Sequence, residues 1–123
     1  FETLNHYARL DITDLRKTGA GEPPRIAKVY PPEERAAGNR LFVEVAPVAG
    51  AATYRVYVSA YPNGAGAKPV GGAVKDKPNV IYLRGLRPEI PMYLFATYMN
   101  AEKKESKPSP AREVVLKDEF PFK

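Results

Sequence analysis

The sequence predicts an all-β fold, a two-sheet sandwich of about seven short strands. Apolar and polar residues alternate in several short runs, which is typical of half-buried strands. The 123 residues include 13 prolines and 9 glycines, which suits strands that are joined by frequent turns. The stretch from Leu83 to Phe95 has the order strand, tight corner, strand. A hydrophobic content of 44% indicates a globular chain, long enough for one domain with a core.

The segment ahead of Pro24 differs from the rest of the chain. Residues 8–13 alternate like a strand, but neighbouring apolar residues also fit helical spacing, so both conformations stay open. Residues 17–24 contain two glycines and end in a Pro-Pro pair, as linkers often do. We therefore expect residues 1–23 to form an N-terminal extension or a linker from a preceding domain, and residues 24–123 to form the sandwich.

From Pro24 onward the pattern is steady, and turn residues separate the expected strands. Pro31-Pro32 ends the first strand because proline cannot donate to a strand ladder. Pro62-Asn63-Gly64 is a strong turn signal. The stretch Ala65 to Lys77 is rich in Gly and Lys, so we expect a loop or a weak edge strand there. The remaining strands are expected at Arg25–Tyr30, Arg40–Ala46, Thr53–Ala60, Asn79–Leu83, Met92–Asn100 and Arg112–Lys117.

Four local patterns in this order and spacing resemble the fibronectin type III family. They are Leu41-x-Val43-x-Val45, the Gly50 to Val58 stretch, Leu83 to Pro88 followed by Tyr93-x-Phe95, and Lys104 to Ser109. The resemblance covers residues 24–117 and implies an immunoglobulin-like two-sheet sandwich. The chain departs from the family at Val45, where a buried Trp is usual, and at Thr97, where Val or Ile is usual.

The corner between the strands at 79–83 and 92–100 resembles the tyrosine corner of that family. A Tyr early in a strand after a sheet-crossing turn can bury its ring and bond its hydroxyl to the turn backbone. We therefore assign structural roles to Leu86, Pro88 and Tyr93. Leu86 caps the core, Pro88 fixes the turn, and Tyr93 locks the corner.

Alternation also predicts which side chains face outward. With Tyr54, Val56 and Val58 inward, Tyr57 faces outward. In the strand at 92–100 we expect one alternating set inward, namely Tyr93, Phe95, Thr97 and Met99. The resemblance implies that the two strands are neighbours, so Tyr57, Leu94 and Tyr98 would form an outer apolar patch with Arg55 beside it. On the other sheet, Phe42 and Tyr82 are expected to be outward neighbours.

Three interpretations of the Tyr57 patch stay open. Aromatic cross-strand pairs stabilise a sheet without any ligand. The patch could instead be a docking face for residues 1–16 or for an adjacent domain. The third interpretation is sugar stacking on the tyrosines. Exposure of Tyr57 and Tyr98 discriminates among them, because a covered pair indicates docking and a bare, coplanar pair indicates glycan binding.

Several function classes are disfavoured by composition. The net charge of +5 is spread along the chain, whereas a nucleic-acid site would concentrate basic and aromatic residues. No apolar run approaches the ~18 residues of a membrane span. The chain has no Cys and one His, so we expect no metal site and no thiol chemistry. A Gly-x-Ser-x-Gly motif is absent too, and we expect neither a cofactor nor catalysis.

The family resemblance implies a non-catalytic accessory module of a larger, secreted multidomain protein. Such a module would space or dock neighbouring domains, at an extracellular or cell-surface location. One alternative is a carbohydrate-binding module of a polysaccharide-degrading enzyme, with polysaccharide as its partner. Another is an adhesion module that binds protein through the loops at Ala65–Lys77 and Ala101–Lys107.

Overall fold

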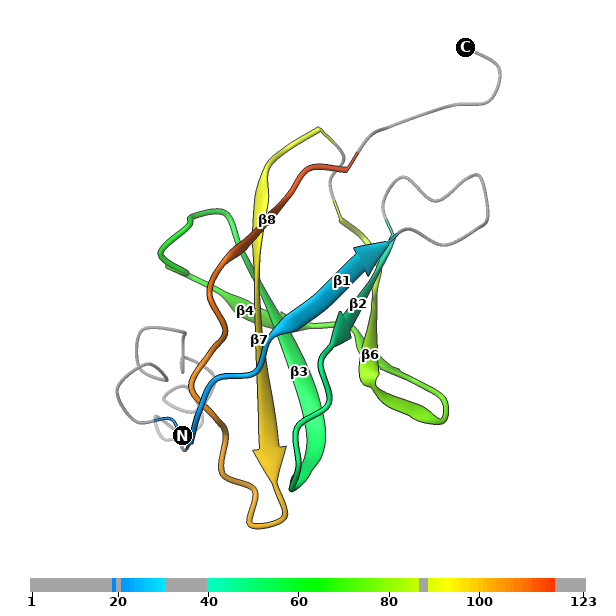
Figure 1. The fold of residues 1–123 in the computed structure, drawn as a ribbon. Helices are drawn as coiled ribbons and strands as arrows, with labels where there is room; N and C mark the ends of the chain where they lie inside the picture. Colours follow the sequence, from blue (N-terminus) through cyan, green and yellow to red (C-terminus); the bar gives the residue numbers. More distant parts are fainter. Residues whose placement is uncertain (1–18, 20, 31–39, 87–88, 117–123) are drawn as a thin grey trace, which may run out of the picture.

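The chain forms two antiparallel four-stranded sheets (Figure 1). A computed structural model describes residues 19, 21–30, 40–86 and 89–116, so the expected strand at 8–13 lies outside the described residues. The sheets have the strand orders β1-β2-β6-β5 and β4-β3-β7-β8. The strands are β1 (Ile26–Tyr30), β2 (Leu41–Val45), β3 (Ala51–Ser59), β4 (Lys68–Val70), β5 (Gly72–Val74), β6 (Lys77–Leu83), β7 (Met92–Asn100) and β8 (Arg112–Val114). The all-β sandwich prediction is confirmed.

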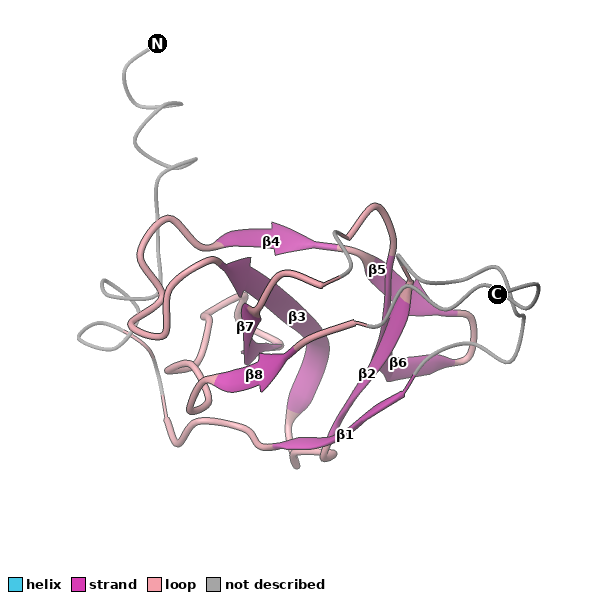
Figure 2. Cartoon of the chain, turned by 90° about the horizontal axis from the view of Figure 1, so that it is seen from above, coloured by secondary structure: helices cyan, strands magenta, loops and turns pink. Residues whose placement is uncertain are grey.

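The two sheets lie face to face and bury one apolar core between them (Figure 2). In β2 the alternation works as expected, because three aliphatic side chains are buried and the two residues between them are half-exposed. Val45, at the position where the family usually has Trp, is fully buried. The core residues are Ile26, Leu41, Val43, Val45, Val56, Ile81, Leu83, Met92, Leu94, Ala96 and Leu116.

The stretch expected as a loop or weak edge strand contains two very short strands, one in each sheet. The chain changes sheet at Gly71, between β4 and β5. Gly71 has φ +76°, and a Cβ there would lie 2.5 Å from both Leu83 Cδ2 and the Tyr82 carbonyl oxygen. Only glycine fits this crossing without strain. The crossing explains why the structure has eight described strands where about seven were expected.

After β7 the chain runs back along the same strand before β8 begins. In this return segment, residues 104–109, the Ser106 N–H donates to the Tyr98 carbonyl at 2.8 Å and the Ser109 N–H to the Ala96 carbonyl at 2.9 Å. Their hydroxyls accept the N–H groups of Tyr98 at 3.1 Å and Ala96 at 2.9 Å. Serine hydroxyls thus satisfy backbone donors of β7 that a regular ladder would pair with carbonyls.

The expected inward face of β7 is wrong by one residue. Val56 pairs with Ala96 and Val58 with Leu94, and directly opposed residues share a face of a sheet. Leu94 and Ala96 are therefore inside the sandwich, each with no exposed surface. The opposite set, which includes Phe95 opposite Tyr57, points to the outer face. A slip of one residue moves a whole strand's side chains to the other face.

The corner prediction fails for the same reason. Met92 enters the core between the sheets, and Leu86 packs at its border as expected. Tyr93 instead packs on the outer face, and its hydroxyl lies 3.4 Å from Glu113 Oε2 on β8. Among the residues that the structure describes, Tyr93 forms no tyrosine corner, and Pro88 lies outside them.

Candidate functional site

The predicted patch of Tyr57, Leu94, Tyr98 and Arg55 is only half assembled. Tyr57 and Arg55 lie on the outer face of the β3–β7 pair, two residues apart on β3. Leu94 belongs to the core, and Tyr98 lies on the inner face opposite Tyr54. The structure therefore brings Tyr57 and Arg55 together and separates both from the other two residues.

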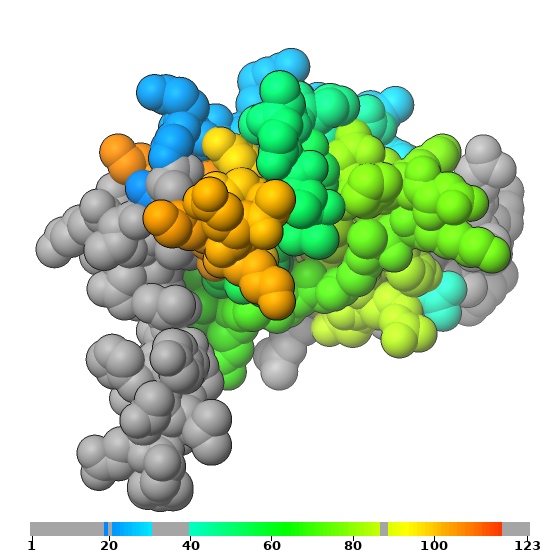
Figure 3. All heavy atoms as spheres, turned by 90° about the horizontal axis from the view of Figure 1, so that it is seen from below, coloured from blue at the N-terminus to red at the C-terminus, as the bar shows by residue number. Residues whose placement is uncertain are grey.

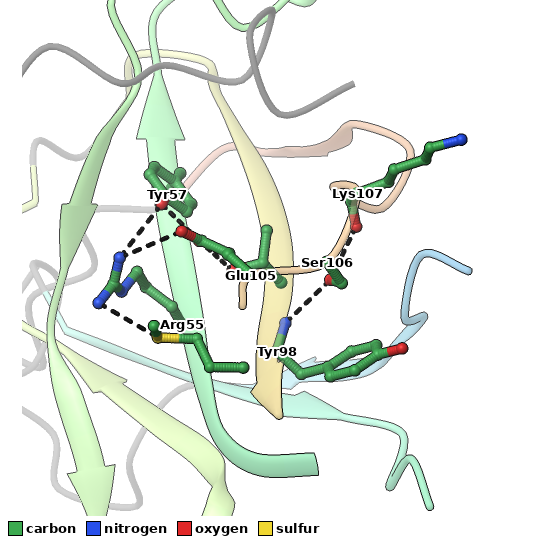
Figure 4. Close-up of polar contacts among 8 residues, drawn as sticks. Arg55, Tyr57, Tyr98, Glu105, Ser106 and Lys107 are labelled. Atoms are coloured by element: carbon green, nitrogen blue, oxygen red, sulfur yellow. Dashed lines mark hydrogen bonds and ion pairs between the residues drawn. The ribbon is translucent and has the colours of Figure 1, made fainter. Parts of the chain in front are cut away.

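A carboxylate that the sequence analysis did not single out connects this outer face. Glu105, in the return segment, accepts hydrogen bonds from Tyr57 Oη at 2.5 Å and Thr97 Oγ1 at 2.6 Å. Its other oxygen forms an ion pair with Arg55 Nη1 at 3.3 Å (Figure 4). Arg55 Nη2 also lies 3.6 Å from the sulfur of Met99. One acid thus joins β3, β7 and the return segment.

This polar cluster is largely removed from water. Tyr57 is 2% exposed, Thr97 has no exposed surface, and the Glu105 side chain is 10% exposed. Burial raises the pKa of Tyr57 to about 12, and the hydrogen bond to Glu105 acts in the same direction. Tyr57 therefore stays protonated and donates to a buried carboxylate. Because its ring is also buried, it is not available to a ligand, and its role is structural.

The chain itself covers the Tyr57 face, because Tyr57 clusters with Ala67 and Phe95 and its hydroxyl is held by Glu105 of the return segment. Because Tyr57 is 2% exposed, sugar stacking on its ring is not supported. Its hydrogen bond to Glu105 supports the structural interpretation, and docking of residues 1–16 on this face lies outside the described residues. Glu105 could not be found by alternation, because it lies in an irregular segment among lysines. The available signal was the Lys104–Ser109 pattern itself, which placed this segment next to the final strands.

Tyr98 marks the end of the sandwich where the described chain enters. A Cβ at Gly21 would lie 3.0 Å from Tyr98 Oη, so the chain ahead of β1 runs past this ring. On the opposite strand, Tyr54 Oη accepts the Val48 N–H at 2.9 Å. Figure 3 shows this end, with the chain before β1 (blue) beside the loop that follows β7 (orange).

The second sheet carries a row of three aromatic rings on its outer face. Phe42 pairs with Tyr30 on one side and with Tyr82 on the other. The ring centroids are 5.3 Å apart for Tyr30–Phe42 and 4.8 Å apart for Phe42–Tyr82. The Lys28 ammonium lies 5.1 Å from the Tyr30 centroid. The predicted outward pairing of Phe42 and Tyr82 is confirmed.

The rings of this row contact each other at different angles. Tyr30 and Phe42 are stacked, with planes that differ by 23°, whereas the planes of Phe42 and Tyr82 are tilted by 33°. A sugar-binding platform needs ring faces that are coplanar and open to solvent. The central ring, Phe42, has neighbours on both sides. The row is thus a cross-strand ladder that stabilises the sheet.

A hollow of ≈ 930 Å³ adjoins the Tyr82 end of the ladder. We call it the Tyr82 hollow. Gly72 pairs directly with Tyr82, and a Cβ at Gly72 would meet nothing within 4 Å. The missing side chain leaves the space beside Tyr82 empty of protein atoms. The hollow is lined by Phe42, Val70, Gly71, Gly72, Ala73, Val74, Tyr82, Arg84 and Gly85.

Neither a metal cluster nor a membrane helix is found in the part of the chain that the structure describes. No three His, Cys, Asp or Glu side chains there gather closely enough to hold a metal ion. The same residues contain no helix that is long and apolar enough to cross a membrane.

These features define a β-sandwich module of the immunoglobulin-like class. No known family's sequence profile matches the chain, and no curated protein is similar to it in sequence. Solved structures narrow the class to a fibronectin type III-like fold.

Three such structures illustrate the similarity. The fibronectin type III domain of the human KIAA0970 protein has a TM-score of 0.55 and 15% identity, over 98% of this chain and 86% of that one. The fibronectin type III domain of human fibronectin type III domain containing protein 3 has a TM-score of 0.51 and 18% identity, over 85% and 96%. The twitchin kinase region from C. elegans has a TM-score of 0.54 and 20% identity, over 80% of this chain. The chain spans 17% of that twitchin region's length.

Proposed function

We propose that this chain is a non-catalytic module of a larger protein, in which it spaces neighbouring domains and docks one of them. The observation that carries the proposal is the course of the chain through the fold. Gly21 lies next to Tyr98, near the last residue of β7. At the other end, the Glu89 N–H donates to the Leu116 carbonyl at 2.7 Å, just ahead of the first residue of β7.

The described chain thus enters at one end of the sandwich and leaves at the other (Figure 1). The 9 residues of β7 separate the two ends. At ~3.3 Å per residue the separation is about 30 Å. Segments that join such a module at its two ends are held apart by a rigid core, which is the property that a spacer needs.

Docking is supported by the difference between the two outer faces. The chain itself covers the Tyr57 face, whereas the other sheet has the Tyr82 hollow at its edge. The loop at Ala101–Lys107 carries Glu105 and therefore serves the fold. Residues 70–74, within the other loop of the adhesion alternative, line the hollow instead. A polysaccharide partner gains no support from the stacked ladder, and an extracellular or cell-surface location stays part of the proposal.

A distance measurement tests the spacing role. The chain has no Cys, so Glu22→Cys and Val115→Cys supply two unique labelling sites on exposed residues. Electron-spin distance measurements on the doubly labelled chain should give one narrow distribution at about 25–35 Å. Fusing folded reporter domains to both ends should leave it unchanged. A broad distribution, or one below about 15 Å, would contradict a rigid spacer with opposite ends.

A further inference from the structure

The Tyr82 hollow has the chemistry of a site for one apolar side chain. Phe42 and Tyr82 contribute aromatic surface, Val70 and Val74 contribute aliphatic surface, and Arg84 is the one charged residue in the lining. Because Gly72 leaves open space beside the Tyr82 ring, a flat or branched apolar group can pack there. A partly open hollow with a mainly apolar lining and one cation favours a ligand that joins an apolar group to an anion.

The charge around the hollow is one-sided. Residues 72–85, which form β5, β6 and their connections, contain three basic residues and a single acidic one, Asp76. Elsewhere on the outer face of this sheet, Lys28 and Glu44 pair in register and offset each other. The net charge at the β5 edge is therefore positive, and it complements an acidic partner.

The hollow also lies along an open strand edge. β5 is the outer strand of its sheet among the described residues, with β6 on one side only. Gly72 and Ala73 are exposed, and Val74 is half-exposed. An edge strand presents N–H and C=O groups that can pair with a further strand. An extended peptide that pairs there points alternate side chains toward the outer face.

We propose that the Tyr82 hollow binds an extended acidic peptide segment of a partner protein, which pairs with β5 and inserts an aromatic or branched apolar side chain beside Tyr82. The acidic residues of the segment face Arg84 and the neighbouring lysines. This inference rests on the proposed docking function and names the chemistry of the docked partner. Binding is weak, on the order of 0.1 mM, because the edge offers only a few backbone bonds.

The test is an NMR titration of the isotope-labelled full chain with three acetylated peptides of equal length. The acidic peptide EVFVED should give saturable backbone amide shifts confined to residues 70–74 and 82–85. The basic peptide KVFVKK and the peptide EVAVED, which lacks the aromatic group, should bind at least about tenfold more weakly. Equal shifts with EVFVED and KVFVKK, or shifts located elsewhere, overturn the proposal.

Two variants and one matched control make the assignment specific. Gly72→Leu should fill the hollow without strain, because the space at the Cβ position of residue 72 is open. It should weaken the binding of EVFVED at least about tenfold. Arg84→Glu should reverse the preference toward KVFVKK. Arg112→Glu, at an exposed position of β8, makes the same charge change on the other sheet and should leave the binding of both peptides unaffected. If Arg112→Glu acts as strongly as Arg84→Glu, net charge alone explains the binding and the site is refuted.

Other occupants give different results in the same experiment. Cellohexaose that shifts residues 70–74 when EVFVED does not would assign the hollow to sugar. Shifts at these residues that grow with protein concentration, without peptide, would assign it to a second copy of the chain. Either result overturns the peptide proposal and leaves the end-to-end distance test of the spacer role untouched.

Discussion

Removing the Glu105 carboxylate should destabilise the fold far more than removing a typical surface acid. Glu105→Ala leaves the hydroxyls of Tyr57 and Thr97 without their acceptor, in a cluster where both residues are almost fully buried. Each buried unsatisfied hydroxyl costs about 1.5 kcal/mol. The Arg55 side chain is 41% exposed, so water replaces most of its ion pair. The expected loss in the free energy of unfolding is about 3 kcal/mol.

Urea unfolding followed by far-ultraviolet circular dichroism measures this loss. At a slope of about 1.5 kcal/mol per molar urea, the midpoint should fall by about 2 M. The control is Glu113→Ala, which removes an exposed acid from the same sheet and a contact of 3.4 Å to Tyr93. It should change stability by less than about 0.5 kcal/mol.

A double-mutant cycle isolates the contact between Tyr57 and Glu105. Tyr57→Phe should cost about 1.5 kcal/mol in the native background, since it removes a hydrogen bond to a charged group. In the Glu105→Ala background it should cost about 1 kcal/mol less. The reasoning is refuted if Glu105→Ala costs no more than Glu113→Ala, because the acid would then not be a buried acceptor.

Three further predictions follow from the same geometry. Gly71→Ala should lower the free energy of unfolding by about 2–4 kcal/mol, because φ at Gly71 is positive and the added Cβ would overlap β6. Gly72→Ala should be nearly neutral. Equal costs of the two substitutions in urea unfolding would disprove the crossing geometry. Ser106→Ala and Ser109→Ala should each cost about 1–3 kcal/mol by leaving a β7 N–H without its hydroxyl acceptor, and hydrogen exchange should speed up at those amides and not in β2. The pKa of Tyr57 rises from 10.0 to about 12 on folding, so its contribution to the free energy of unfolding is complete below pH 10 and is lost as the pH rises toward 12. The free energy of unfolding should therefore fall more steeply at alkaline pH in the native chain than in Tyr57→Phe.

Strand positions followed from the sequence because turn residues and alternation act locally. In β2 the aliphatic set is distinct from Phe42 and Glu44, so the pattern identified both the strand and its inner face. The outward pairing of Phe42 with Tyr82 then followed from alternation together with the strand neighbours that the family resemblance implies. These are the cases in which one face of a strand is clearly more apolar than the other.

The inner face of β7 could not be derived in this way. The strand is apolar on both faces, since Met92 and Leu94 enter the core while Tyr93 and Phe95 pack on the outer face. When both faces of a strand are covered, the alternation pattern does not show which set of side chains points into the core. The outer face is covered in part by Ala67 and by Glu105 of the return segment, whose path depends on hydrogen bonds that no local pattern reveals.

The Tyr82 hollow was also beyond sequence reasoning. It exists because the chain changes sheet at Gly71 and then places a residue without a side chain, Gly72, opposite Tyr82. A Gly-Gly pair in a lysine-rich stretch is equally typical of a flexible loop. The location of the hollow therefore required the pairing of β5 with β6.

The central claim is that the chain itself closes the Tyr57 face and leaves the ladder of the other sheet accessible. Tyrosine nitration of the native chain, mapped by mass spectrometry, tests this claim most directly. Tyr61, which is 60% exposed, should react first, the half-buried Tyr30 and Tyr82 should follow, and Tyr57 should stay unmodified until the chain unfolds. Nitration of Tyr57 at a rate comparable to that of Tyr61 would contradict the account, because the Tyr57 face would then be open.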